Sequence, residues 1–159
     1  MSKITKPIHR FLLLSGLATL LLGCGNSYAE NPESEDLWLS DHQAAMEKAK
    51  EKERPVLLNF TGSDWCPPCI QMERTVFQTP EFAEGVRDDW VLLELDFPRG
   101  IEQPETLQRQ NQTLAEQFGI QGFPTFVLLN ADGEELARHV GGKPGGPEAF
   151  LRWLEASRD

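Results

Sequence analysis

The stretch that decides the fold is Trp65-Cys66-Pro67-Pro68-Cys69, in which two residues separate two cysteines. Cysteines at this spacing can close a small disulfide at the first turn of a helix, where unpaired backbone N–H groups stabilise a thiolate and lower the pKa of a thiol placed there. Pro67 suits that turn because its φ is already fixed and its missing N–H is not needed. We therefore predict a redox centre with Cys66 as nucleophile. The same spacing also serves zinc, so the motif alone leaves a metal site open.

Apolar runs and helix signals on both sides of this stretch predict the surrounding elements. Ser40 with Gln43 has the signature of a capping box, and Thr79 before Pro80 predicts a second helix start. The expected elements are, in order, a helix from Ser40 that ends before Pro55, a strand over 56–60, a helix from Cys66 through Phe77, a helical turn at Pro80, a strand over 90–96, a helix over 105–118, a strand over 125–129, a hairpin turn over 130–133, a strand over 134–140 and a helix from Pro147. This order predicts an α/β fold, with a central mixed sheet and helices on both faces.

Residues 1–23 have the pattern of a signal peptide, because three basic residues precede an apolar run over 11–22 that is short for a bilayer span. Residues 21–24 resemble the bacterial lipoprotein box, which would make Cys24 the lipidated residue. Residues 27–29 offer the alternative of ordinary cleavage after residue 29. The chain has three cysteines, so Cys24 is left over once Cys66 and Cys69 pair, and lipidation or cleavage both account for it. We favour the lipoprotein, with residues 24–36 as a flexible tether and 37–159 as the folded domain.

Charge argues against one class of partner. The signal segment holds three of the 15 basic residues and none of the 25 acidic ones, so 12 basic and 25 acidic residues remain after its removal, a net charge of −13. An acidic surface repels phosphate backbones, so we expect no nucleic-acid partner.

Residues 122–125 (Gly-Phe-Pro-Thr) open the next strand but one after the cysteines, and with that spacing the chain from about Leu37 to Ser157 resembles the thioredoxin superfamily. The run from Cys66 to Glu81 is similar to the C-terminal domain of the bacterial thiol-disulfide interchange proteins, and residues 62–66 are similar to small secreted thioredoxin-like reductases. The resemblance implies that Cys66 attacks a substrate disulfide and that Cys69 resolves the mixed disulfide. It also implies that Pro124 is cis and exposes the backbone of Phe123 to substrate.

One departure from the family concerns a buried aspartate, which serves thioredoxins as a base for the second cysteine. The nearest equivalent is Asn59, with one extra residue in the turn before Cys66, and an amide cannot accept that proton. The resemblance makes Glu73, one helical turn beyond Cys69, the first candidate to replace the acid, and Glu94 the second.

These observations predict an exported thiol-disulfide oxidoreductase, a monomer held in the periplasm by a lipid anchor alone. We expect a reductase, because no basic or histidine residue stands between Cys66 and Cys69 to favour the thiolate. It would exchange disulfides with protein substrates without a cofactor and be recharged by a membrane or periplasmic electron-relay protein. Trp65 is expected to cover the disulfide or fill a groove, and Phe123 to contact substrate or join the core.

The alternative is a thioredoxin-fold module for metal delivery or assembly, in which the cysteines do not turn over. We expect no zinc site, because a closed site needs four ligands and only His42 and His139 remain beside the cysteine pair.

Overall fold

The computed structural model describes residues 37–158. The signal segment 1–23, Cys24 and the tether 24–36 lie outside the described residues, so their assignment stays a prediction. Within residues 37–158, no helix is long and apolar enough to cross a membrane.

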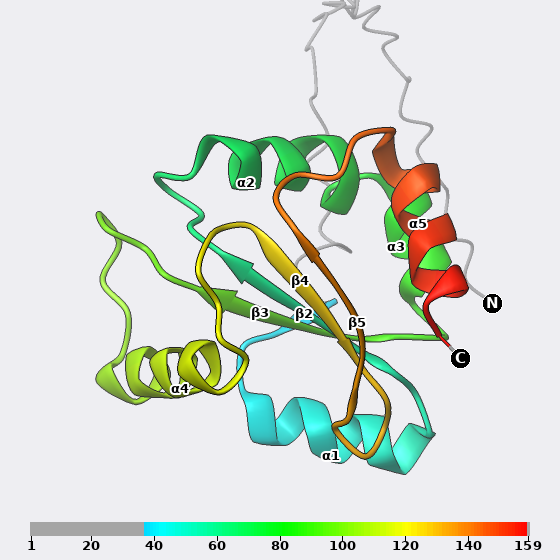
Figure 1. Ribbon diagram of the computed structural model, residues 1–159, viewed down its shortest axis with the longest axis horizontal. Coiled ribbons are helices and arrows are strands. Elements are labelled where there is room, and N and C mark those ends of the chain that lie inside the picture. The colour runs from blue at the N-terminus through cyan, green and yellow to red at the C-terminus, as the bar shows by residue number, and fades with distance from the viewer. Residues whose placement is uncertain (1–36, 159) are drawn as a thin grey trace, which may run out of the picture.

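Within residues 37–158, five strands form one mixed sheet in the order β1-β3-β2-β4-β5 (Figure 1). The strands are β1 (Trp38–Leu39), β2 (Val56–Thr61), β3 (Val91–Asp96), β4 (Thr125–Leu129) and β5 (Glu135–Val140). β3 runs parallel to both β1 and β2, whereas β4 runs antiparallel to β2 and to β5. All six residues of the central strand β2 are buried, as expected for an apolar strand covered on both faces.

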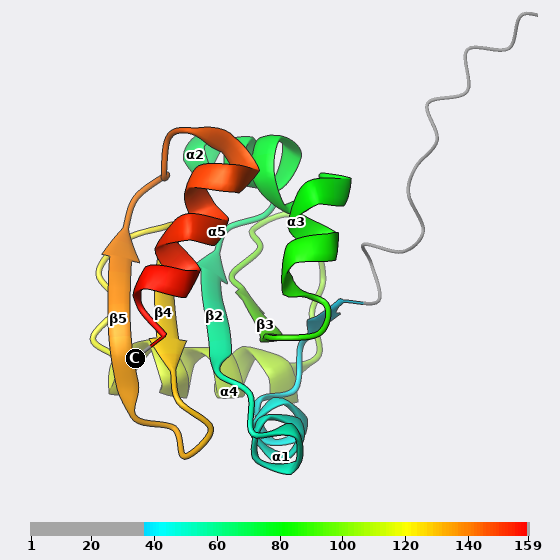
Figure 2. The ribbon, with the colours of Figure 1, turned by 90° about the vertical axis from the view of Figure 1, so that its right-hand side faces the viewer.

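Helices cover the two faces of this sheet (Figures 1 and 2). They are α1 (His42–Lys52), α2 (Pro67–Met72), the π-helical turn η1 (Glu73–Phe77), α3 (Pro80–Val86), α4 (Glu105–Gln117) and α5 (Gly146–Ala156). Figure 1 shows α2, α3 and α5 on one side of the sheet, and α1 and α4 on the other. This arrangement confirms the predicted α/β fold with a mixed sheet and helices on both faces.

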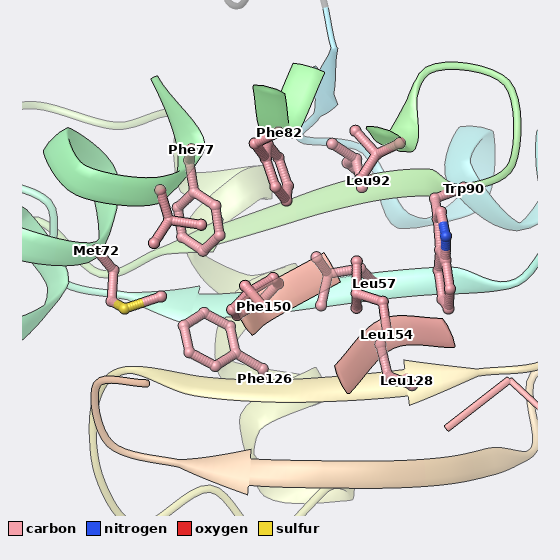
Figure 3. Packing of buried hydrophobic residues seen from close by; sticks show 12 residues of the cluster. Leu57, Met72, Phe77, Phe82, Trp90, Leu92, Phe126, Leu128, Phe150 and Leu154 are labelled. Carbon is pink, nitrogen blue, oxygen red and sulfur yellow. The ribbon is translucent and has the colours of Figure 1, made fainter. Parts of the chain in front are cut away.

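In the described part of the chain, two hydrophobic cores lie between the helices and the sheet. The aromatic core lies under α2, η1, α3 and α5 (Figure 3) and consists of Leu57, Met72, Val76, Phe77, Phe82, Val86, Trp90, Leu92, Phe126, Leu128, Phe150 and Leu154. The aliphatic core lies on the other face and consists of Ala45, Ala49, Val56, Leu58, Phe60, Val91, Leu93, Leu95, Leu114, Val127 and Leu129. Side chains alternate between the faces along each strand. Asn59 therefore faces the aromatic core, as Leu57 does.

Two details of the helix starts test the sequence predictions. Thr79 caps α3 as predicted, because its hydroxyl accepts a hydrogen bond from the backbone N–H of Phe82 at 3.3 Å. The prediction that Ser40 caps the first helix is wrong: Asp41 is the N-cap and accepts a hydrogen bond from Ala44 at 2.8 Å. The distant Gln110 also serves this helix start: its Oε1 accepts a hydrogen bond from the His42 N–H, and its Nε2 donates to the Ser40 carbonyl oxygen. A local capping pattern does not reveal this partner.

Candidate active site

Cys66 and Cys69 form a disulfide at the start of α2, directly after the turn that follows β2. Their Cα atoms are 5.2 Å apart, and each residue is only 3 % exposed. Cys66 is the N-cap residue of α2, and its backbone N–H donates to the carbonyl oxygen of Gly62 at 2.9 Å. Because α2 continues into η1, helical backbone runs from Pro67 to Phe77. The structure therefore places the cysteine pair where the sequence predicts it.

The indole of Trp65, the residue before Cys66, is held by the loop that follows β3. Its Nε1 donates to the carbonyl oxygen of Phe97 at 2.7 Å, and the Arg99 guanidinium lies 3.6 Å from the ring centroid. The ring also contacts Phe123 edge-on, with centroids 5.8 Å apart. These contacts fix a half-buried aromatic surface next to Cys66.

Asp64 ties the same loop to the active-site turn. Its carboxylate accepts hydrogen bonds from the backbone N–H groups of Gly100, at 2.5 Å, and Arg99, at 3.0 Å. These two bonds, Gly100 first, hold the pKa of Asp64 below its ordinary value. The local sequence gives no sign of this role, because the partners of Asp64 lie more than 30 residues away.

The peptide bond between Phe123 and Pro124 is cis, as predicted. Pro124 is buried and Phe123 is half-buried, and the carbonyl oxygen of Pro124 accepts a hydrogen bond from Gly141 at 2.8 Å. The Phe123 ring packs against Phe97 as well as Trp65. The structure thus brings the second sequence motif to the aromatic side chain of the first.

The candidate acids lie on the face of the sheet that carries the aromatic core. Asn59 is 2 % exposed, and its Oδ1 has no hydrogen-bond partner among the described residues. Glu73 begins η1, where its backbone N–H donates to the carbonyl oxygens of Cys69 and Ile70. Burial raises the pKa of Glu73, although a hydrogen bond from the Gln78 side chain opposes the effect.

Glu94 is perturbed more strongly than Glu73. It is the Cα partner of Asn59 in the pairing of β3 with β2. Burial first, then the charges of Glu73 and Asp96, raise the pKa of Glu94 to about 7. The sequence placed Glu94 second, because the register that sets it beside Asn59 is not visible in the chain order.

Other features of the described residues lie apart from this chemistry. A hollow of about 730 Å³ separates the loop after β3 from α4, and neither cysteine lines it. Across residues 37–158, no three His, Cys, Asp or Glu side chains gather as a possible metal site.

Comparison with known proteins agrees with this geometry. A family described as a thioredoxin-like domain matches residues 42–158. The disulfide bond reductase DsbH of Chlamydia pneumoniae is 38% identical over 122 residues, which cover 77% of this chain and 73% of that protein. The thioredoxin-related protein DsbJ of the same organism is 36% identical over 129 residues, 79% of this chain but only 37% of its own length.

Solved structures support the same assignment. The DsbH oxidoreductase superimposes with a TM-score of 0.71 at 36% identity, covering 76% of this chain and 82% of that chain. The reduced C-terminal domain of DsbD from Neisseria meningitidis gives a TM-score of 0.56 at 26% identity, with 73% and 93% covered. The chain therefore belongs to the thioredoxin-like domain family, as a thiol-disulfide oxidoreductase whose disulfide pair is Cys66 and Cys69.

Proposed function

We propose that this protein is an exported disulfide reductase that transfers electrons to disulfides of protein substrates. The observation that carries the proposal is the buried Cys66–Cys69 pair at the start of α2, whose neighbour Trp65 contacts Phe123 of the cis Phe123–Pro124 peptide. The likeness to a chlamydial protein named a disulfide bond reductase supports the direction.

The reaction consists of two disulfide exchanges. In the reduced protein, the thiolate of Cys66 attacks one sulfur of the substrate disulfide. A mixed disulfide forms, and the other substrate sulfur leaves with the electron pair and takes a proton from water. Cys69 then loses its proton and attacks the Cys66 sulfur, which closes the Cys66–Cys69 disulfide and releases the second substrate thiolate. The protein is oxidised by two electrons and the substrate is reduced by two.

Trp65, Phe123 and Pro124 are proposed to receive the substrate. The rings of Trp65, which precedes Cys66, and Phe123, which precedes Pro124, contact each other. They would present apolar surface to residues that flank a substrate cysteine. Substrate backbone would lie along Phe123 in an extended conformation, as a strand added to an edge.

The direction of transfer can be measured. The protein should equilibrate with glutathione buffers at a potential closer to thioredoxin, about −270 mV, than to the oxidant DsbA, about −120 mV. It should also reduce insulin when a chemical reductant recharges it, whereas Cys66→Ser should have no activity and Cys24→Ser should keep full activity. An oxidising potential, or full activity in Cys66→Ser, would contradict the proposal.

Export and anchoring form a separate part of the proposal, supported by the residues around Cys24. A lipid on Cys24 would tether a monomer to the periplasmic face of a membrane, where a membrane or periplasmic relay protein would supply electrons. Labelled palmitate should enter the native protein and not Cys24→Ser, and the variant should be found in the soluble periplasmic fraction. Equal labelling of both proteins would contradict the assignment.

The competing function is metal delivery without turnover. Metal titration of the reduced protein separates the two, because stoichiometric tight binding together with no insulin reduction would replace the reductase proposal.

A further inference from the structure

An acidic side chain on β3 lies beside the position where thioredoxins carry their buried aspartate. Glu94 and Asn59 are Cα partners, and Leu92 and Leu57 are paired two residues earlier in the same register. Both leucines belong to the aromatic core. Side-chain alternation therefore directs Glu94 and Asn59 to the same face of the sheet. α2 and η1, the segments that carry Cys69 and Glu73, cover this face.

The charged groups that act on Glu94 are all carboxyls. The charge of Glu73 acts on Glu94 from η1, and the charge of Asp96 acts on it from two residues further along β3. Asp96 already accepts hydrogen bonds from the backbone and the hydroxyl of Ser63. The described parts of β1, α3 and α5 that pack on this face contribute apolar side chains, and β2 contributes the neutral Asn59. When several carboxyls lie close together, one bound proton relieves their mutual repulsion. Glu94, with a pKa of about 7, is the carboxyl that binds this proton near neutral pH.

Asn59 lies on the same face of the sheet as Glu94. Its Oδ1 is a buried acceptor to which no described residue donates. A neutral carboxyl has an O–H group to donate, whereas a carboxylate can only accept. An aspartate at position 59 would instead compete with Glu94 for the same proton.

We propose that the proton-holding acid of this fold has moved from β2 to β3 in this chain, so that Cys69 exchanges its proton with the Glu73–Glu94 pair. The inference rests on the proposed reductase function. Glu94 is a positioning residue, because its charge is coupled to that of Glu73, and Glu73 follows Cys69 by one turn of the same helical segment.

The proton balance of the second exchange follows. The ionised carboxyl pair accepts the proton of the Cys69 thiol, and the resulting thiolate forms a bond to Cys66 Sγ. The bond between Cys66 and the substrate sulfur breaks, and its electron pair leaves on the substrate thiolate. That thiolate receives the proton from the carboxyl pair, which returns to its ionised state. No other oxidant or reductant is required.

The test is the pH dependence of Cys69 alkylation in the fully reduced protein. Iodoacetamide reacts with the thiolate, and peptide mass spectrometry measures modification at Cys69 separately from Cys66 and Cys24. The native profile should show two inflections, one near pH 7 from the carboxyl pair and one from the thiol. Glu94→Gln should lose the first inflection. Between pH 7 and the pKa of the thiol it should raise the alkylation rate by roughly three- to tenfold, because the negative charge that Glu94 carries there in the native protein no longer opposes the thiolate.

Glu84→Gln, which changes an exposed carboxyl on α3, is the matched control and should keep the native profile. A Glu94→Gln profile that matches this control would overturn the inference. If Glu94→Gln does not fold, carbon NMR of the native protein gives the same decision. The Glu94 carboxyl should titrate near pH 7 and respond again when Cys69 ionises, because coupled titrations are reciprocal. A single titration near 4.5 would overturn the inference.

The alkylation experiment requires no turnover, so its outcome is independent of the insulin assay. Loss of insulin reduction in the native protein would reject the reductase function. If the native protein reduces insulin but Glu94→Gln leaves the alkylation profile of Cys69 unchanged, only the role of the carboxyl pair is rejected.

Discussion

Replacing Glu94 by glutamine should make the oxidised protein more stable at alkaline pH and leave it nearly unchanged at acidic pH. Burial and neighbouring carboxyls raise the pKa of Glu94 to about 7 in the folded state, against the ordinary value of 4.5 for a glutamate side chain. The folded state therefore binds more protons than the unfolded state between these two values. Stability from this group is fully present below pH 4.5 and is lost as the pH rises through 7.

The size of the effect follows from the shift. A displacement from 4.5 to about 7 corresponds to about 3 kcal/mol, of which roughly 2 to 3 kcal/mol is lost between pH 5 and pH 8. Glutamine keeps the shape and the donor but has no charge to bury. The free energy of unfolding of Glu94→Gln should therefore exceed that of the native protein by about this amount at pH 8. At pH 5 the two free energies should differ little.

Urea unfolding of the disulfide-bonded protein at pH 5 and pH 8 measures both differences. Keeping the disulfide intact removes the titration of the two thiols. Comparing the variant with the native protein cancels the contributions of titratable groups that do not interact with Glu94. Glu84→Gln should show the native pH dependence. The reasoning is refuted if the stability difference between Glu94→Gln and the native protein is the same at both pH values.

Two further substitutions test local contacts. Thr79→Ala removes the cap of α3 and should cost about 1 kcal/mol in urea unfolding, whereas Thr113→Ala, on an exposed face of α4, should change stability by less than about 0.5 kcal/mol. Gly62→Ala would place a Cβ 2.5 Å from the Trp65 indole, so it should cost about 1 to 3 kcal/mol and slow insulin reduction. Gly142→Ala, whose Cβ would lie 3.7 Å from Pro68, should change neither stability nor insulin reduction. Equal effects of the two threonine variants, or of the two glycine variants, would contradict the assigned contacts.

Features that depend on neighbouring residues were predictable from the sequence. The apolar run at 56–60 identified the central strand, which the structure extends by one residue to Thr61. Thr79 before Pro80 identified a helix start, because cap and proline act within one turn. The resemblance identified the cis bond at Pro124, which the structure contains.

Features that the local sequence pattern does not show were missed or, for Glu94, ranked second. β1 has only two residues, and it is a strand because Trp38 and Leu39 pair with Leu92 and Leu93 of β3. The π-helical turn at 73–77 interrupts a helix whose apolar spacing gave no sign of it. Asp64 and Glu94 owe their environments to residues 35 positions away, Arg99 and Asn59 respectively. A pattern read along the chain does not contain these pairings.

The central claim is that Cys66 exchanges disulfides with protein substrates and that Cys69 resolves the product, and trapping measures it most directly. Reduced Cys69→Ala should hold a protein disulfide substrate as a covalent adduct that a reductant releases, with mass spectrometry locating the bond at Cys66. Cys66→Ser carried through the same steps should hold far less. If Cys69→Ala forms no adduct, or forms it through a residue other than Cys66, the account of this site is contradicted.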